Sequence, residues 1–543
     1  MLRDLALALS LSNLSFISAW RLLLIPSSFF IYHHKDPRPV VDYVALILDV
    51  MVLATLFFIT IVLARRSKYK SVRTATKVGF ILILSVPLHG LLSQIDNSTV
   101  RHFLLPLLED EVVARRILFT VPLTLSVFIV LIGLLRMDRA VRIASGLVLI
   151  LMPLLPLSIV QAIVTATKGT PHKIERAAAT IAHVPDRGRL RVVWLVFDEL
   201  DYRTAFENRP PDMRLPELDR LASESLFAEN AFPPAGETFL TMPALITGRL
   251  VSDARRKGGD ELMIQFGDES DLTAWSAQPN IFSRAREAGF NTALVGWYHP
   301  YCTILGNNLT KCAWEDGLLP HSEGLTPYMY THALQAAQTP PFASFIFRPK
   351  VELGARLRKK HISDLDSMYK HAIDFATDRD ISVVMVHWPI PHHPNIYDRA
   401  NNSISEAAGR SYLDNLALVD RTVGDFRRMM EASGAWDESA VLITSDHWWR
   451  GRAIWKKFKS WTAEDEKASA GVVDHRVPFI LKLPGSGQPT KFSQPFNTVL
   501  THDLMLAILR GEVSDPGAAA AWLDRHRSIG RSPYDERSSR SAE

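Results

Sequence analysis

Arg191-Val-Val-Trp-Leu-Val-Phe197 is a short, nearly continuous apolar run, and Asp198-Glu199-Leu200 follows it at once. Such a run is typical of a parallel β-strand that is buried on both faces of its sheet. Similar runs occur further along the chain, at Thr292-Ala-Leu-Val-Gly296, Ile381-Ser-Val-Val-Met-Val386, Ala440-Val-Leu-Ile-Thr444 and Val477-Pro-Phe-Ile-Leu-Lys482. These runs predict the strands of one sheet.

Helical patterns lie between the predicted strands, at Pro216–Glu224, Ile281–Ala288 and Ser411–Ser433. Strands that alternate with helices predict an α/β fold with a mostly parallel sheet covered by helices on both faces. Ligands of such folds bind beyond the carboxyl ends of the strands. Asp198 and Glu199 directly follow one predicted strand, and Asp446 and His447 follow another. These acidic and imidazole side chains are therefore expected to meet at one edge of the sheet.

The first 168 residues have a different composition, dominated by apolar runs. Crossing a bilayer takes roughly 20 apolar residues. Four runs of that kind stand out, and a weaker fifth is interrupted by Arg21 and Pro26; they lie at 40–64, 77–94, 117–136, 142–165 and 10–32. The alternative for the weaker run is a signal sequence, but no small-x-small cleavage site follows it. We therefore expect a bundle of about five transmembrane helices.

Loop charge predicts how this bundle is oriented. The loop after the 40–64 run carries basic and no acidic residues, which is typical of a cytoplasmic loop: Arg65, Arg66, Lys68, Lys70, Arg73 and Lys77. The loop at 95–116 contains several acidic residues and is expected outside. Everything after residue 168 then lies on the outer, periplasmic side of the plasma (inner) membrane, in a multi-pass protein.

The sequence predicts four parts: a transmembrane helical domain at 1–168, a linker at 169–190, an α/β domain at 191–512 and a disordered tail at 513–543. The tail is assigned from its richness in Ala, Arg, Ser and Asp. The formal net charge is only +4, and no long Lys/Arg cluster follows the apolar region. No nucleic-acid partner is therefore expected.

The two cysteines, Cys302 and Cys312, lie close together in the sequence. Outside the cytoplasm they can form a disulfide across a loop. The alternative is a pair of unpaired, small apolar residues. No Cys-x-x-Cys motif is present, which argues against a structural zinc site.

Three patches of the predicted α/β domain resemble the alkaline-phosphatase/sulfatase superfamily. They are Phe197-Asp198-Glu199-Leu200, then Gly236-Glu-Thr238-Phe-Leu-Thr-Met-Pro243-Ala-Leu-Ile-Thr-Gly248-Arg249, then Thr444-Ser445-Asp446-His447 with His475-Arg476-Val477-Pro478 after it. Each patch alone is a weak signal, but their order and spacing together make chance similarity improbable. The resemblance covers residues 191–485. With helices ahead of it, the chain resembles the membrane-bound phosphoethanolamine and phosphoglycerol transferases of that superfamily.

The resemblance implies one divalent metal ion, held by Asp198, Glu199 or both, by Asp446 and His447, and by the hydroxyl of Thr238. Mixed oxygen and imidazole ligands suit Zn²⁺ or Mn²⁺ better than Ca²⁺. Metal coordination makes a hydroxyl more acidic. Thr238 is therefore the implied nucleophile, which would form a phospho-threonine intermediate.

Two alternatives to this role of Thr238 remain. Thr241 is also close in the sequence, although the superfamily spacing back from Gly248-Arg249 selects Thr238. A threonine at this position can also serve only as the N-cap of a helix.

Three histidines are implied to contact the substrate: His299, His392 and His475. His299 ends a Gly296-Trp-Tyr-His299 patch that resembles the Gly-Lys-Trp-His of sulfatases, and His392 lies in a Pro-His-His-Pro segment. A histidine can protonate a leaving oxygen or donate a hydrogen bond to a phosphoryl oxygen. The alternative is a histidine with a purely structural role, which we expect for His387 and His393.

The chain departs from sulfatases in several places. No Cys/Ser-x-Pro-x-Arg motif stands at the nucleophile, and Trp297 replaces the sulfate-binding lysine. No Asp-x-x-x-His motif for a second metal ion is present, which favours one metal. Trp448 and Trp449 follow His447 where the family has glycine, so they shape a substrate pocket or face the membrane interface.

The leading hypothesis is transfer of a phospho-head-group, of phosphoethanolamine or phosphoglycerol type, from a membrane phospholipid to an envelope glycan or lipid. The second is hydrolysis of phosphate or sulfate esters with water as acceptor. The third is a non-enzymatic membrane protein with a decayed site, against which the intact Thr, Asp and His set argues.

Overall fold

The computed structural model divides the chain into two compact units, here called the helical unit and the α/β unit. The helical unit comprises Met1–Phe29, Asp36–Pro171 and His321–Glu352, and the α/β unit comprises Phe30–Lys35, His172–Pro320 and Leu353–Glu543. The structure describes residues 1–24, 40–92, 124–125, 127–168, 190–257, 261–267, 269–315, 324–338, 353–458, 460–471, 473–485 and 487–527.

The α/β unit is built on one mixed sheet, which has nine strands in the described part of the chain. At its centre β1 (Arg191–Asp198) pairs in parallel with β11 (Ser439–Ser445) on one side and β8 (Val383–Pro391) on the other. β12 (Val477–Lys482) runs antiparallel to both of its neighbours. The other strands are β2 (Leu226–Phe232), β6 (Thr292–Trp297), β7 (Lys311–Glu315), β13 (Thr490–Phe492) and β14 (Phe496–Asn497). The prediction of a mostly parallel sheet is confirmed.

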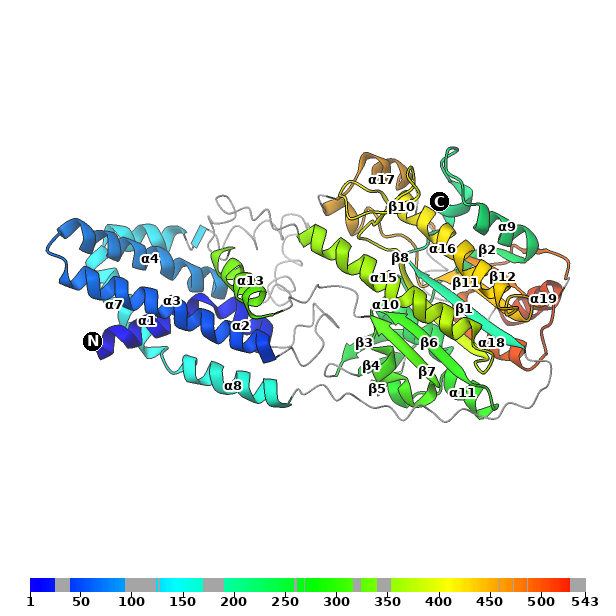
Figure 1. The fold of residues 1–543 in the computed structure, drawn as a ribbon, viewed down its shortest axis with the longest axis horizontal. Helices are drawn as coiled ribbons and strands as arrows, with labels where there is room; N and C mark the ends of the chain where they lie inside the picture. Colours follow the sequence, from blue (N-terminus) through cyan, green and yellow to red (C-terminus); the bar gives the residue numbers. More distant parts are fainter. Residues whose placement is uncertain are drawn as a thin grey trace. The chain divides into compact units, whose positions relative to one another are not determined.

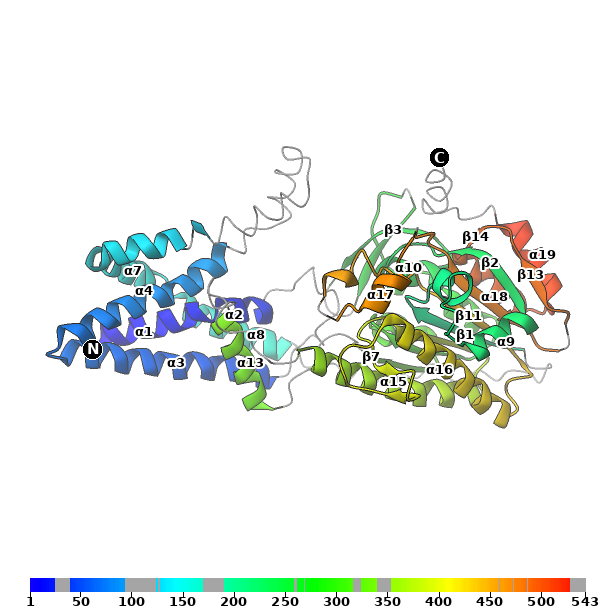
Figure 2. The same cartoon turned by 90° about the horizontal axis from the view of Figure 1, so that it is seen from above.

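Both faces of this sheet are covered because the central strand is apolar on both sides. Val193, Leu195 and Phe197 of β1 point into one core, beneath α9 (Pro216–Glu224), α15 (Leu353–Thr377) and α16 (Tyr412–Ala432). The alternate residues Val192, Trp194 and Val196 point into a second core, beneath α10 (Thr238–Thr247), α11 (Ile281–Glu287), α18 (Thr501–Leu509) and α19 (Pro516–His526). Figure 2 shows the sheet between these two helical layers.

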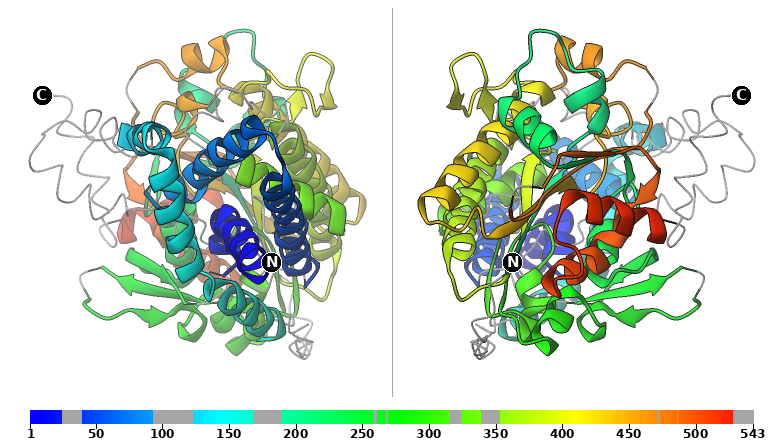
Figure 3. Two further views of the ribbon diagram at one scale, coloured as in Figure 1. Left: turned by 90° about the vertical axis from the view of Figure 1, so that its left-hand side faces the viewer. Right: turned by 90° about the vertical axis from the view of Figure 1, so that its right-hand side faces the viewer.

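A second, antiparallel sheet of three strands, β3 (Val251–Arg256), β4 (Leu262–Phe266) and β5 (Thr273–Ala274), follows α10. It stands at the periphery of the α/β unit, drawn in green in Figure 3. Short elements complete the unit, among them α12 (Tyr301–Ile304), a β9–β10 ribbon (Tyr397–Asp398, Ser403–Ile404) and α17 (Ala463–Ala468).

Cys302 on α12 and Cys312 on β7 form a disulfide, with their Cα atoms 5.7 Å apart. Of the two alternatives that the sequence left open, the disulfide is therefore confirmed. Disulfides persist in oxidising compartments outside the cytoplasm.

Among its described residues, the helical unit contains two runs long and apolar enough to cross a membrane, Val40–Arg66 and Met137–Thr167. They match the spans predicted at 40–64 and 142–165. The predicted 77–94 span falls mainly within α4 (Lys70–Leu92). The described part of the weaker 10–32 span is divided between α1 (Leu2–Ser15) and α2 (Ile17–Leu24), and residues 25–32 lie outside the described residues. The span at 117–136 and the outer loop at 95–116 lie wholly or partly outside the described residues. The other helices in the described part of this unit are α3 (Val40–Arg66), α7 (Met137–Ile150), α8 (Leu154–Lys168) and α13 (Leu325–Gln338), all labelled in Figure 1.

Helix α13 belongs to the helical unit, although its sequence lies within the predicted 191–512 domain. It packs on α3, where His332 is buried between two acids of that helix. His332 Nε2 is 2.9 Å from Asp42 Oδ1, and Nδ1 is 3.3 Å from Asp49 Oδ2. The contiguous α/β domain predicted from the sequence is therefore interrupted.

The prediction of a disordered tail from residue 513 is wrong for 516–526, which form helix α19. Asp515 caps this helix by accepting a hydrogen bond from the backbone of Ala518, and Pro516 stands in its first turn. Trp522 and Leu523 are buried in the second core. Burial of these apolar residues outweighs the polar composition on which the prediction relied. The rest of the tail from 528, and the predicted linker apart from residue 190, lie outside the described residues.

Candidate active site and metal centre

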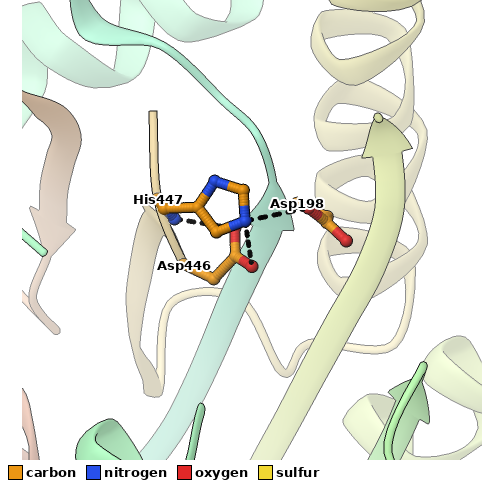
Figure 4. A group of neighbouring side chains, drawn as sticks. All are labelled: Asp198, Asp446 and His447. Atoms are coloured by element: carbon orange, nitrogen blue, oxygen red, sulfur yellow. Dashed lines mark hydrogen bonds and ion pairs between the residues drawn. The ribbon is translucent and has the colours of Figure 1, made fainter. Parts of the chain in front are cut away.

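Three side chains converge at the carboxyl ends of β1 and β11. Asp198, Asp446 and His447 each offer one possible ligand atom, and these three atoms lie within 4.8 Å of one another. All three residues are almost completely buried. Figure 4 shows the imidazole and the two carboxylates turned toward one another beyond β1. The strand register explains this, because Phe197 pairs with Ser445 and the acidic residue that follows each leaves the same edge.

The two strand ends are also held together by hydrogen bonds. The hydroxyl of Ser445 donates to the carbonyl oxygen of Phe197 over 2.7 Å and accepts from the backbone N–H of Leu200 over 2.8 Å. The backbone N–H of Asp446 donates to the same carbonyl of Phe197. The positions of the two carboxylates are therefore fixed by the backbone of the sheet.

Thr238 is the first residue of helix α10, and its hydroxyl faces this cluster. Thr238 Oγ1 donates to Asp446 Oδ2 over 2.7 Å and lies 3.2 Å from His447 Nε2. The hydroxyl of Thr241 instead donates to the backbone oxygen of Ala235 over 3.0 Å. Of the two threonines that the sequence offered, the structure brings Thr238 to the acidic and imidazole side chains.

The cluster fits a divalent cation. Both carboxylate oxygens of Asp198 are buried without a hydrogen-bond partner among the described residues. Burial and the negative charge of Asp446 raise the pKa of Asp198 well above its ordinary value, and burial raises the pKa of Asp446 to about 7. Two buried acids with this electrostatic penalty favour a bound positive charge.

His447 is oriented as a metal ligand. Its Nδ1 lies 3.0 Å from the backbone oxygen of Trp448, a contact that requires a proton on Nδ1. Burial and the charge of Arg450 hold the pKa of His447 well below its ordinary value. The neutral ring therefore presents an unprotonated Nε2, which lies 3.7 Å from Asp198 Oδ1.

Glu199, which the sequence offered as a further metal ligand, lies outside this cluster. Its backbone adopts a left-handed conformation, with φ of 66°. Its buried carboxylate accepts hydrogen bonds from Arg450 Nε over 3.2 Å and from Trp455 Nε1 over 2.7 Å. Glu199 reaches the metal-binding residues through its backbone N–H, which donates to Asp446 Oδ1 over 3.1 Å.

Of the three histidines implied to contact substrate, two lie against the cluster. His299 Nε2 is 3.1 Å from the backbone oxygen of Thr238. The backbone N–H of His392 donates to the backbone oxygen of Asp198 over 3.1 Å. Burial lowers the pKa of His299 to about 3 and that of His392 well below its ordinary value, so both rings are neutral near pH 7.

The third histidine, His475, packs against Trp448, the residue that follows His447. Its ring lies on that of Trp448, with centroids 4.1 Å apart, and its φ is 64°. Trp448 also covers Gly236, where an added Cβ would lie 2.5 Å from the indole. Trp448 thus packs on the turn that precedes Thr238.

Trp449 lines a small, open pocket together with three further aromatic residues and several polar ones. The lining residues are His393, Asn395, Tyr412, Trp449, Trp455, Ser460, Trp461 and Asp465. Of the two tryptophans after His447, Trp449 therefore lines a pocket, whereas Trp448 is not among the residues that line it.

Two residues of the site were missed by the sequence reasoning. His387, expected to be structural, lies on β8 with its Nε2 4.0 Å from Asp446 Oδ2. Arg450 lies outside the motifs from which the site was predicted. Its place four residues after Asp446, beyond the same strand end, is a signal that could have identified it.

Residues 191–510 match the family model described as sulfatase. No curated protein matches the chain. Among solved structures, Ps i-CgsB bound to k-i-k-neocarrahexaose is 16% identical, with a TM-score of 0.40, over 60% of this chain and 72% of that one. The phosphonate monoester hydrolase of Agrobacterium radiobacter is 14% identical, with a TM-score of 0.37, over 59% and 73%. The lipoteichoic acid synthase LtaP from Listeria monocytogenes is 14% identical, with a TM-score of 0.36, over 61% and 75%.

Proposed function

The chain belongs to the sulfatase family, whose members are enzymes, and we propose that it transfers a phospho-head-group through Thr238 in a metal-dependent reaction. The observation that carries the proposal is the position of the Thr238 hydroxyl. Thr238 is the first residue of helix α10. Its hydroxyl is hydrogen-bonded to Asp446 and lies close to His447 of the metal-binding cluster. The ligands proposed for the single metal ion are Asp198, Asp446 and His447, with Thr238 as the fourth.

The residues support each requirement of such a transfer. A bound Zn²⁺ or Mn²⁺ would supply positive charge that favours the deprotonated hydroxyl. The Thr238 hydroxyl already donates its proton to Asp446 Oδ2, which gives that proton a short route away from the attacking oxygen. Helix α10 begins at Thr238 without a side-chain cap, and the N-terminus of a helix favours phosphate. As the threonine oxygen–phosphorus bond forms, the ester bond to the donor breaks and the leaving oxygen takes up a proton.

We place the donor among membrane phospholipids and the acceptor among envelope glycans or lipids. The apolar runs Val40–Arg66 and Met137–Thr167 support a membrane anchor, within a bundle of about five helices. An anchor raises the effective concentration of a lipid donor at the site. The Cys302–Cys312 disulfide and the basic loop after α3 support an active site on the periplasmic side of the inner membrane.

Hydrolysis of a phosphate or sulfate ester is the second candidate, because the same nucleophile and metal site serve when water is the acceptor. Membership of the sulfatase family supports hydrolysis as the second candidate. The two reactions differ in one measurable product. A hydrolase releases free head-group or phosphate in the absence of an acceptor, whereas a transferase stops after one modification of each enzyme molecule.

The test is mass spectrometry of the full chain after incubation with lipid extract and Zn²⁺ or Mn²⁺. We expect added mass on the peptide that contains Thr238, and the size of that mass identifies the transferred group. Thr238→Ala should lose the modification and reduce turnover by at least about a thousandfold. Thr241→Ala is the matched control on the same helix and should retain the modification. Undiminished turnover in Thr238→Ala would refute the proposal and indicate direct attack by water.

A further inference from the structure

Arg450 lies beside the metal-binding cluster with most of its hydrogen-bonding capacity unused. Its side chain is 19% exposed, and Nε donates to Glu199 Oε1 over 3.2 Å. In the part of the chain that the structure describes, neither terminal nitrogen, Nη1 or Nη2, has a hydrogen-bond acceptor. A guanidinium held at one edge leaves its remaining N–H groups as a planar donor set for an anion.

The guanidinium is held by a carboxylate that is itself fixed. Glu199 is fully buried, and its second oxygen accepts from Trp455 Nε1 over 2.7 Å. Its backbone oxygen accepts from the hydroxyl of Tyr412 over 2.8 Å. The left-handed backbone at Glu199 is one that a non-glycine residue rarely adopts, and such conformations concentrate at functional sites. The local structure therefore maintains one orientation of Arg450.

In this orientation the positive charge of Arg450 lies close enough to act on the three residues of the cluster. The charge of Arg450 opposes the rise in the pKa of Asp198 and Asp446 and lowers the pKa of His447. Glu199 also links Arg450 to the cluster, because the backbone N–H of Glu199 donates to Asp446 Oδ1. Glu199 accepts only from Nε of Arg450, so the N–H groups on Nη1 and Nη2 can donate to an oxygen anion that enters from outside.

We propose that Arg450 is a further catalytic residue, which binds the non-bridging oxygens of the group transferred to Thr238, and that Glu199 and Trp455 position it. The proposal rests on the group transfer proposed above. Arg450 forms no covalent bond and exchanges no proton. It donates hydrogen bonds to oxygens whose negative charge grows as the donor ester bond breaks, and donors placed in this way accelerate such reactions.

The test uses the full, metal-loaded chain in detergent and follows the release of p-nitrophenolate from bis(p-nitrophenyl) phosphate, with kcat/KM taken from the first turnover, which needs no acceptor. Arg450→Ala should lower kcat/KM by about a hundredfold or more and weaken competitive inhibition by inorganic phosphate at least about tenfold. Arg450→Lys should recover only part of the loss, because an ammonium ion cannot present a planar pair of donors. Glu199→Gln should lower kcat/KM less than Arg450→Ala. Added guanidinium ion should restore activity to Arg450→Ala and not to Thr238→Ala.

Arg452→Ala is the matched control, since Arg452 lies on the same loop and pairs with Glu466 and Ser469 at the surface. Metal content and thermal stability should equal those of the wild type in both arginine variants. The proposal is overturned if Arg450→Ala keeps the wild-type affinity for phosphate, or if it loses its metal and guanidinium ion restores nothing. Failure of the proposed function has a different signature, namely full turnover in Thr238→Ala.

Discussion

The hydroxyl of Thr238 is a neutral, weakly acidic group, and its proposed reactivity comes from its neighbours. Two buried carboxylates and a neutral imidazole face it, from the ends of two adjacent strands. At this scale, small changes of charge at fixed shape are the informative ones, because they leave packing intact.

Asp446→Asn is such a change. Asparagine preserves the size of the side chain but removes the charge that a cation requires, so we expect metal affinity to fall by more than about a hundredfold, with activity lost in parallel. His447→Ala should behave in the same way. Metal content of the purified chain, measured by mass spectrometry, checks this. Asp437→Asn, an exposed acid before the start of β11, is the control and should bind metal normally. A metal-free Asp446→Asn variant with full activity would contradict the assignment.

The sequence predicted Thr238, Asp198, Asp446 and His447 because strand ends and motif spacing can be recognised without a structure. It could not separate Asp198 from Glu199, since both follow the same strand. The difference between them depends on the left-handed backbone at 199 and on a hydrogen bond from Trp455, which lies far away in the sequence.

Asp420 offers a test of burial away from the metal site. It lies on α16, is 5% exposed and accepts from the backbone N–H of Leu218 over 2.8 Å. Burial raises its pKa from 3.8 to about 7. Because the folded-state pKa is the higher one, the stability contributed by this group is fully present below pH 3.8. It is lost as the pH rises through about 7.

Asp420→Asn should therefore flatten the fall in Tm between about pH 4 and pH 8, because the amide carries no charge at either end of that range. The measurement is thermal unfolding of the full chain at several pH values. Asp425→Asn, on the same helix but 37% exposed, is the control and should leave the pH profile of the wild type unchanged. An Asp420→Asn profile parallel to that of the wild type would count against this account.

At the scale of elements, helix α10 starts at Thr238, the proposed nucleophile, and ends after ten residues. Gly248 ends it with a left-handed C-cap, at φ of 71°. A Cβ at this position would lie 2.6 Å from Nδ1 of His502 on α18. The glycine thus allows both the turn and the close approach of the neighbouring helix.

Gly248→Ala combines backbone strain with a steric clash, and we expect it to destabilise the α/β unit by more than about 1–3 kcal/mol. Gly267→Ala is a matched control, because its φ of 48° is also left-handed but its Cβ would meet no atom within 4 Å. Denaturant unfolding of both variants separates the two contributions. Equal losses would mean that the contact with His502 has no energetic effect.

Helix α19 marks the limit of composition as a guide to elements. Its Ala- and Arg-rich sequence resembles that of a solvated tail, and only two of its residues, Trp522 and Leu523, supply large buried apolar side chains. The helix-start signal Asp515-Pro516 was present in the sequence. Such a signal alone does not predict a stable helix, because stability also depends on the surface that the helix covers.

At the scale of the whole molecule, the chain leaves the α/β unit after β7 and contributes α13 to the helical unit before α15 begins. Periodicity alone could not predict this, because α13 has the length and composition of an ordinary domain helix. Its partner, α3, lies far earlier in the sequence, and buried contacts between distant segments have no local signature.

A fragment that begins at residue 172 therefore carries α13 without its partner helix. We expect this fragment to aggregate, because Tyr328 and other side chains buried in the full chain become exposed. Replacing 324–338 by a Gly/Ser linker of equal length should increase the monomeric fraction. Size-exclusion chromatography of the two fragments checks this, and identical elution profiles would show that α13 tolerates exposure.

The contact of His332 with Asp42 and Asp49 also has a consequence for biosynthesis. In the membrane topology proposed above, the ribosome delivers α3 to the bilayer long before it reaches α13, so the nascent helix arrives with two acids whose histidine has not yet been made. Insertion must proceed with those carboxylates protonated, hydrated or shielded by another factor. In that topology, the anchor is completed late in translation, by a segment delivered from the far side of the bilayer.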